Sequence, residues 1–157
     1  MKYQIRELRE TEYELLNDFL YEAIFIPEGT EAPDRSIIDL PELQIYVENF
    51  GKNDPDRCLT AESDGKILGA VWARIMNDYG HIDENTPSLA ISLYPEYRGQ
   101  GIGTDLMRHM ISLLRNMGFQ QVSLSVQKAN YAVRMYQKLG FRVYRENEEE
   151  YIMLIRL

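Results

Sequence analysis

The order of the predicted elements indicates a mixed α/β fold, β-α-α-β-β-β-α-β-α-β-β, in which helices flank a central sheet. Three observations lead to it. The turn Ser63-Asp64-Gly65-Lys66 separates two apolar runs, which predicts a hairpin and makes part of the sheet antiparallel. Residues 88–127 have the pattern strand, amphipathic helix, strand, which predicts a parallel right-handed crossover. With 157 residues and no repeat or linker, the chain is expected to form one domain, residues 1–157.

The N-terminal part of the chain predicts one strand and two helices. Residues 3–8 alternate between polar and apolar side chains, as in a half-buried strand. Thr11 and Glu14 have the spacing of a capping box, which predicts that the first helix begins there. Pro41 suits the first position of a second helix, and Gly51 is placed to end it.

The remaining elements follow from periodicity and from glycines at the expected helix ends, Gly118 and Gly140. They are strands at 57–63, 66–76, 88–94 and 120–127, helices at 102–117 and 130–139, and two last strands at 141–145 and 151–157 joined by an acidic turn. The apolar run 151–155 fits either an interior strand or the contact of a homodimer, and periodicity does not choose between them.

The charge distribution argues against a nucleic-acid-binding protein. The net charge is −8, whereas duplex binding relies on massed lysine and arginine. From Arg98 to Arg145, however, eight basic residues stand against one acidic residue. A basic half on an acidic body suits a polyanionic small molecule and leaves an acidic surface for a cationic partner. Charges that are merely solvated would give the same pattern.

The sequence shows no targeting or membrane signal. The first residues alternate and lack the long apolar stretch of a signal peptide, and no apolar run approaches the length of a membrane span. The one cysteine, Cys58, has no partner for an internal disulfide, and its neighbours predict a buried strand position. The protein is therefore expected to be cytoplasmic.

The segment from Ser88 to Thr104 carries the chemistry. It runs from a strand through the glycine-rich turn Arg98-Gly99-Gln100-Gly101-Ile102-Gly103 into a helix. Glycines let a ligand approach the backbone, and the first amides of a helix have no partner within the helix. Together with the helix dipole and the charge of Arg98, they predict a phosphate-binding site.

Two common phosphate-binding motifs do not fit this turn. A Walker A loop requires Gly-Lys-Ser/Thr, but Gly103 is followed by Thr104 without a lysine. A dinucleotide fingerprint requires a third glycine at position 104 or 106, and these are Thr104 and Leu106. A nucleotide-binding enzyme is therefore a weak alternative.

What remains, Arg98-x-x-Gly101-x-Gly103, resembles the Arg/Gln-x-x-Gly-x-Gly/Ala signature of the GNAT N-acetyltransferase superfamily. The segment from Asn130 to Phe141 resembles the family's Asn…Ala…Tyr-x-Lys-Leu-Gly-Phe motif, and the element order is similar along nearly the whole chain. The resemblance implies an acetyl-CoA-dependent N-acetyltransferase without a metal.

The resemblance also implies where acetyl-CoA binds. Backbone amides of the turn would hold the pyrophosphate, and the backbone of Leu93 would hydrogen-bond the pantetheine arm. The sheet would splay between residues 88–94 and 120–127 to admit the thioester. Asn130 would contact the cofactor, and a helix-capping role is equally compatible. The predicted cofactor-binding residues are Leu93, Arg98, Gly99, Gln100, Gly101, Ile102, Gly103, Thr104 and Asn130.

Tyr136 matches the family's tyrosine that protonates the departing CoA thiolate, so the resemblance implies a general acid at this position. The base is open, because residues 88–94 contain no carboxylate. Glu84 and His81, in the loop before that strand, are the candidates beside Asp83 and a chain of water molecules.

The acceptor is expected to be a primary amine. In the family its pocket is built from the first helices and strand ends, which here means residues 25–40, Trp72, Arg74 and the loop 77–87. Seven acidic residues in these segments suggest a cationic acceptor such as a polyamine, an aminoglycoside-like molecule or a lysine-containing peptide. A non-catalytic CoA-binding sensor with the same fold is the alternative function.

Overall fold

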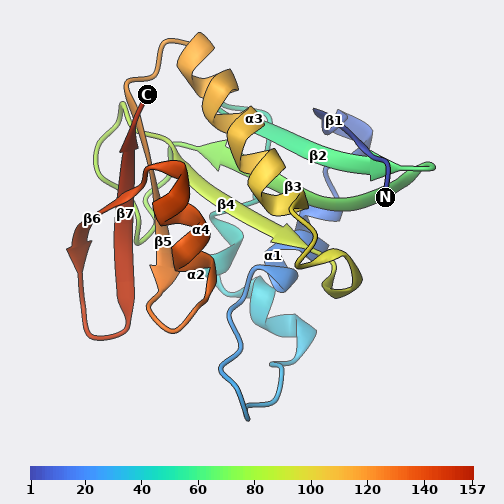
Figure 1. The fold of residues 1–157 in the computed structure, drawn as a ribbon, viewed down its shortest axis with the longest axis horizontal. Coiled ribbons are helices and arrows are strands. Elements are labelled where there is room, and N and C mark those ends of the chain that lie inside the picture. Colours follow the sequence, from blue (N-terminus) through green and yellow to red (C-terminus); the bar gives the residue numbers. More distant parts are fainter.

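A computed structural model describes residues 1–157 and shows a seven-stranded sheet with helices on both faces (Figure 1). The strands are β1 (Gln4–Glu7), β2 (Arg57–Ser63), β3 (Lys66–Arg74), β4 (Ser88–Leu93), β5 (Gln121–Gln127), β6 (Arg142–Glu146) and β7 (Glu150–Arg156). The α-helices are α1 (Leu15–Glu22), α2 (Pro41–Gln44), α3 (Ile102–Asn116) and α4 (Ala132–Leu139), with 3-10 turns η1 (Glu10–Glu12), η2 (Arg35–Asp39) and η3 (Pro95–Tyr97). The predicted mixed α/β class is confirmed.

The strand order across the sheet is β1-β2-β3-β4-β5-β7-β6. Only β4 and β5 run parallel, and every other neighbouring pair is antiparallel. Asp64 and Gly65 join β2 to β3 with φ values of 50° and 80°, the left-handed angles that a tight hairpin turn needs. Both the predicted hairpin and the predicted parallel crossover are therefore present.

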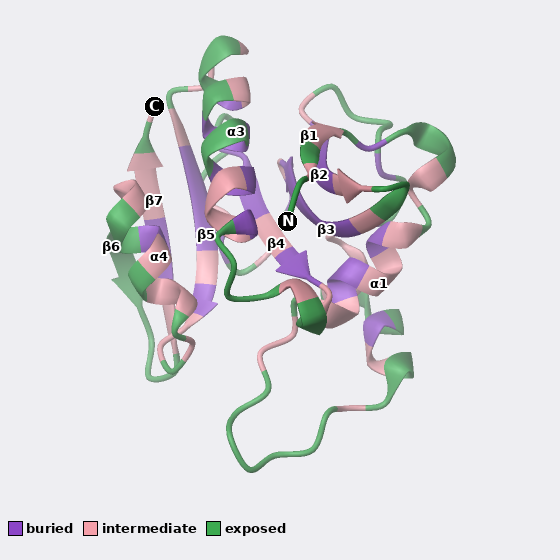
Figure 2. Cartoon of the chain, turned by 45° about the vertical axis from the view of Figure 1, so that its right-hand side comes forward, coloured by how far each residue is buried: buried purple, intermediate pink, exposed green.

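Successive side chains of β3 point to opposite faces of the sheet, and the hydrophobic core is therefore divided into two halves. Val71 and Ala73 pack with α3, whereas Ala70 and Trp72 pack with α1 on the opposite face. Figure 2 shows buried residues along β3, β4 and β5 in the middle of the sheet. The strand β7 lies between β5 and β6, and its Ile152 is fully buried, so the apolar C-terminal run belongs to the sheet interior.

The capping box predicted at Thr11 and Glu14 is wrong. The Glu12 carboxylate instead accepts the Arg9 backbone N–H at 2.8 Å, and α1 begins at Leu15 without a side-chain cap. Arg6 explains the shift, because its guanidinium pairs with Glu12 at 2.8 Å and fixes that carboxylate beside Arg9.

The second helix starts at Pro41, as predicted, but α2 ends at Gln44 rather than at Gly51. Side chains of β3 take the carbonyls that a longer helix would use. Arg74 donates to the carbonyls of Ile45 and Glu48 at 3.1 and 2.8 Å, and Trp72 donates to the carbonyl of Tyr46 at 3.0 Å. No helix of the protein has both the length and the apolar character to cross a bilayer.

Candidate active site

The strands β4 and β5 pair only near their N-terminal ends. Ser88 lies opposite Ser123, and the Ser123 N–H donates to the Pro87 carbonyl at 3.0 Å. No later residue of β4 pairs with β5, so the sheet opens between these two strands. The predicted splay between residues 88–94 and 120–127 is confirmed.

The backbone of β4 presents polar groups to this opening. Tyr94 N–H donates to the Leu68 carbonyl of the preceding strand segment at 3.0 Å. Because backbone groups alternate in direction along a strand, those of Ile91 and Leu93 point the other way, toward β5. The Leu93 carbonyl accepts from Arg98 Nε at 3.0 Å, which leaves the Leu93 N–H facing the gap. An extended ligand arm can therefore pair with β4 as an added strand.

The turn between η3 and α3 needs its glycines. Gly99 and Gly101 have φ values of +74° and +86°, in the left-handed region that disfavours other residues. A Cβ added at either position would meet no atom within 4 Å, so the space above the turn is open. The turn is shaped for close approach of a ligand to its backbone.

Six consecutive amides in this turn have no acceptor within the protein. The first hydrogen bond of α3 runs from the Asp105 N–H to the Gly101 carbonyl at 3.2 Å, and no side chain caps the helix. The N–H groups of residues 99–104 are consequently free. Unpaired amides at the positive end of a helix dipole suit an anionic group such as a pyrophosphate.

Arg98 braces this turn against α1. Its Nη2 lies 3.2 Å from Glu22 Oε1 and also donates to the Glu22 carbonyl, while its Nε holds the Leu93 carbonyl. The guanidinium thus connects the end of α1, the end of β4 and the glycine-rich turn. These contacts within the protein hold the turn in position. They are additional to the cofactor contact that the sequence predicts for Arg98.

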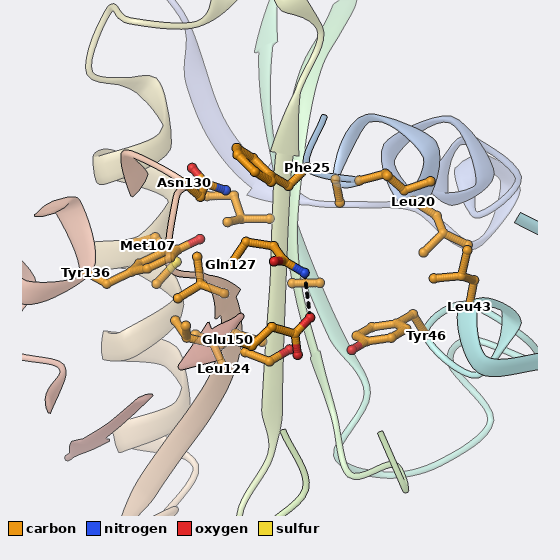
Figure 3. A pocket seen from close by; sticks show the side chains of 17 residues that line it. Leu20, Phe25, Leu43, Tyr46, Met107, Leu124, Gln127, Asn130, Tyr136 and Glu150 are labelled. Atoms are coloured by element: carbon orange, nitrogen blue, oxygen red, sulfur yellow. Dashed lines mark hydrogen bonds between the residues drawn. The ribbon is translucent and has the colours of Figure 1, made fainter. Parts of the chain in front are cut away.

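Two cavities adjoin at the opening of the sheet. The outer cavity, of about 630 Å³, is lined by the glycine-rich turn, the end of α1 and the start of α4. The inner cavity, of about 300 Å³, lies between β4, β5 and the N-terminal helices (Figure 3). The two cavities are continuous, because six residues line both. The outer cavity forms a long arm and the inner cavity a smaller chamber. The shared residues are Ala23, Ile24, Phe25, Ile91, Asn130 and Tyr136.

Tyr136 lies where the two cavities meet. Its side chain is 7 % exposed, its ring packs on Phe141 with centroids 6.0 Å apart, and its hydroxyl makes no hydrogen bond within the protein. Figure 3 shows the hydroxyl directed into the inner cavity. Burial raises the pKa of Tyr136 to about 12, so the phenol stays protonated at neutral pH and remains able to donate.

Asn130 also lines both cavities. Its Oδ1 accepts from the Ala132 N–H, the first amide of α4, at 2.9 Å, although the N-cap position itself is held by Tyr131. Its role toward a cofactor stays a prediction.

The two candidate bases lie outside both cavities. The Glu84 side chain is 85 % exposed, and His81 Nε2 lies 3.6 Å from Glu84 Oε1. His81 Nδ1 is buried without a hydrogen-bond partner. Neither residue lines the inner or the outer cavity, so the structure does not bring them next to Tyr136.

Trp72 and Arg74 do not form the acceptor pocket, contrary to expectation. Both side chains are buried on the α1 face of β3, where Arg74 pairs with Asp56 at 3.0 Å. They hold the segment after α2 to the sheet, as their hydrogen bonds to its carbonyls show. Phe25, by contrast, lines both cavities as expected.

Sequence reasoning missed a carboxylate in the inner cavity. Glu150 begins β7 opposite Gln127 of β5, and Gln127 Nε2 donates to Glu150 Oε1 at 2.7 Å. Burial, with a smaller contribution from Glu149, raises the pKa of Glu150. In the sequence Glu150 is one of four glutamates between residues 146 and 150, and only its pairing with β5 distinguishes it.

A second polar group enters the inner cavity from the opposite wall. The Tyr46 hydroxyl donates to Asp78 Oδ2 at 3.1 Å, and the Ser88 hydroxyl donates to Asp78 Oδ1 at 3.0 Å. Burial raises the pKa of both Tyr46 and Asp78. Tyr46 and Glu150 face each other across the chamber in Figure 3.

Comparison with known proteins agrees with this geometry. The acetyltransferase (GNAT) family matches residues 5–141. An acetyltransferase of Pectobacterium atrosepticum is 31 % identical over 64 % of this chain and 67 % of its own length. Human N-acetyltransferase 8B is 32 % identical over 52 % of this chain and 37 % of its own length. The PaiA N-acetyltransferase of Thermoplasma acidophilum, solved in complex with coenzyme A, has the same fold, with a TM-score of 0.74, 22 % identity and 100 % of both chains covered.

The matched region spans only part of several curated relatives, 37 %, 30 % and 23 % of their lengths. The family match itself extends over most of this chain and includes the glycine-rich turn and the Tyr136 segment. The chain therefore belongs to the acetyltransferase (GNAT) family.

Proposed function

We propose that the protein transfers an acetyl group from acetyl-CoA directly to a primary amine. The observation that carries the proposal is the meeting of two cavities at Tyr136, one leading to six free amides and the other closed by apolar walls and a carboxylate. A long donor and a small acceptor need such an arrangement, because their reacting atoms must come together in one place.

The outer cavity is the proposed acetyl-CoA site. The amides of Gly99, Gln100, Gly101, Ile102, Gly103 and Thr104 hold the pyrophosphate. The Leu93 N–H pairs with the pantetheine arm, and Asn130 lies beside that arm at the entrance to the inner cavity. A protein of the same fold from Salmonella typhimurium, at 16 % identity and a TM-score of 0.70, was solved with its cofactor acetyl-CoA.

Tyr136 is the proposed general acid. The amine attacks the thioester carbon, the carbon–sulfur bond breaks, and the Tyr136 hydroxyl gives its proton to the departing thiolate. The hydroxyl has no partner in the protein, so it is free to face the sulfur. The chemistry needs no covalent intermediate on the protein.

The acceptor is proposed to be an amine that is cationic in solution. None of the acidic residues that suggested this from the sequence lines the inner cavity, and Glu150 supplies the negative charge in their place. An ammonium group is the complement of a single carboxylate in an apolar chamber.

Thermal melts with added ligands test the donor. Acetyl-CoA at a hundred times its dissociation constant stabilises a protein by about 2.7 kcal/mol. For a chain of this size the melting temperature should then rise by roughly 5–10 °C. Acetyl-CoA and CoA are expected to give this shift, whereas ATP and NAD are not. The absence of a shift in folded protein would refute the donor site.

Release of free CoA in the presence of amines tests the transfer. Acetyl-CoA with a set of primary amines should yield free thiol at a rate that depends on the amine concentration. Binding of acetyl-CoA without CoA release for any amine would favour the alternative, a CoA-binding sensor. A shift with ATP in place of acetyl-CoA would favour a nucleotide-binding protein.

A further inference from the structure

The inner cavity is lined mainly by apolar side chains. Thirteen of its 17 lining residues are hydrophobic, and Glu150 is the one charged residue among them. Leu20, Ile24, Phe25 and Leu43 form the wall that comes from the N-terminal helices and the loop after α1. A ligand body that carried several charges would lose its hydration here without gaining partners.

The position of Glu150 is fixed by two strands. Its backbone pairs with Gln127 across β5 and β7, and the Gln127 side chain holds Oε1 at 2.7 Å. The carboxylate retains its second oxygen, Oε2, for another partner. In Figure 3 the carboxylate points toward the Tyr46 hydroxyl. Tyr136, on α4, lines the same cavity.

Resting on the proposed function, we infer that Glu150 binds the ammonium group of the acceptor and takes its proton, and that the rest of the acceptor is apolar. The substrate class is thus a primary amine on an aliphatic or arylalkyl body. Tyr46 lies opposite the carboxylate and positions the ammonium group, with its own hydroxyl held by Asp78.

The protons balance in this scheme. The ammonium group gives one proton to Glu150, and the neutral amine forms the carbon–nitrogen bond as the carbon–sulfur bond breaks. Tyr136 gives its proton to the thiolate and regains one from the nitrogen of the new amide. Glu150 then releases its proton to water. The products are the N-acetylated amine, CoA and one proton.

Several groups set the proton affinity of Glu150. Burial and the like charge of Glu149 both raise its pKa, which brings the carboxylate closer to the working range of a base. Gln127 donates a hydrogen bond to it, and from the opposite wall it faces Tyr46, whose hydroxyl is bonded to Asp78. Removing the Glu149 charge should therefore lower the pKa of Glu150.

The test compares E150Q with E148Q, a matched control in the same turn whose side chain is exposed and outside both cavities. With 2-phenylethylamine as acceptor, E150Q should lower kcat/KM by about 10²-fold, because a positioned base contributes at least that much. E148Q should match the wild type. E149Q should stay active and move the acidic limb of the kcat–pH profile to lower pH.

The same proteins, loaded with CoA, test binding without turnover. By calorimetry, 2-phenylethylamine and hexylamine should bind the wild type more tightly than spermidine, by about tenfold or more. E150Q should lose most of this affinity. With acetyl-CoA, the melting temperature of E150Q should rise by as much as that of the wild type. This result would show that the variant folds and binds the donor, so that its lost activity comes from the missing carboxylate.

The outcomes distinguish the two proposals. If the wild type releases CoA with amines and E150Q equals it in rate, pH profile and amine affinity, the role of Glu150 is wrong and the proposed function stands. Preference for spermidine over apolar amines would overturn the substrate class. If no amine is acetylated but apolar amines bind in a Glu150-dependent way, the binding site stands and the proposed function falls.

Discussion

Most of Tyr136 is buried, but its hydroxyl opens at the junction of two cavities and bonds to no protein group. A hydroxyl that opens into a cavity and has no protein partner is available to a ligand. Its isolation suits a group whose partner is a ligand, and we place the leaving thiolate there. Its ring contributes to the core separately, through contact with Phe141.

The Y136F variant separates these two roles. Removing the hydroxyl keeps the ring and its packing, so the melting temperature and the acetyl-CoA affinity should stay near the wild type. The rate constant kcat for CoA release should fall by about 10²-fold, because proton donation to the thiolate is lost. Steady-state kinetics with thiol detection gives the value. Y144F, at an exposed tyrosine on β6, is the matched control, and equal rates for the two variants would remove Tyr136 from the mechanism.

The individual site residues differ in how far the sequence reveals them. Tyr136 and the glycines lie in contiguous motifs, and the resemblance of these motifs to those of the family is what proposes them. Glu150 lies far from these motifs among other glutamates, and it becomes distinct only because β7 pairs with β5 in one register. His81 and Glu84 were chosen as residues that precede β4 in the chain, but the loop that carries them does not turn into the cavity.

At the scale of elements, a glycine of the glycine-rich turn can be compared with a glycine of the β2–β3 hairpin that has a similar backbone conformation. Gly101 and Gly65 have φ values of +86° and +80°, and a Cβ at either meets nothing within 4 Å. Alanine at either should therefore cost about 1–2 kcal/mol of folding stability through backbone strain. Only G101A should also weaken acetyl-CoA binding, because its methyl group projects toward the ligand space. Melts and titration with acetyl-CoA measure both effects, and an equal affinity of the two variants would contradict the placement of the pyrophosphate.

The pairing of β3 with β4 sets the edge of the opening. Gly69 lies opposite Leu93, and a Cβ there would stand 2.6 Å from the Ser92 carbonyl oxygen and 2.9 Å from Leu93 Cα. Since these are backbone atoms, G69A must displace the end of β4 and should cost roughly 1–3 kcal/mol. The KM for acetyl-CoA should rise as well, because Leu93 is the proposed pantetheine contact. Unfolding in urea and donor kinetics provide the check, and an unchanged KM despite lost stability would argue against that contact.

Local signals predicted most elements, and side chains from distant strands account for the errors. The hairpin at Asp64 and Gly65 and the helix α3 follow from turn chemistry and periodicity. The second helix was predicted too long, because Trp72 and Arg74 of β3 donate hydrogen bonds to the carbonyls of the residues that follow Gln44. The first capping box was misplaced because Arg6 of β1 holds a different glutamate. Contacts between residues that are far apart in the sequence do not change the hydrophobic periodicity of the segment whose structure they alter.

At the scale of the whole molecule, the site is assembled from parts of the chain that lie far apart in sequence. The end of α1, the splayed strands, the start of α3, α4 and the first residue of β7 all line the joined cavities. The placement of β7 between β5 and β6 brings Glu150 into this set. Contiguous motifs and their resemblance to the family therefore predicted the donor half of the site, which is local, but not the acceptor half, which depends on the complete sheet.

The folding free energy of the whole molecule should depend on pH through the ionic cluster that ties β1 to η1 and β2. Arg6 pairs with Glu12 at 2.8 Å and with Glu62 at 2.6 Å. The hydrogen bonds from Arg6 lower the pKa of Glu12 from its ordinary 4.5 to about 2. A carboxylate whose pKa is depressed by folding contributes stability above its unfolded pKa, and this contribution is lost as the pH falls through the folded value. The contribution of Glu12 should thus be complete above about pH 5 and gone near pH 2.

The E12Q variant tests this dependence. The pair is partly exposed, so at pH 7 the loss in unfolding free energy should be about 1 kcal/mol. The difference between E12Q and the wild type should shrink as the pH falls from about 5 toward 2, because the wild-type carboxylate becomes protonated over that range. Urea unfolding at several pH values measures it, with E14Q as the control at an exposed glutamate two residues on. A difference that stayed constant down to pH 2 would mean that Glu12 stabilises the fold through its shape and hydrogen bonds rather than through its charge.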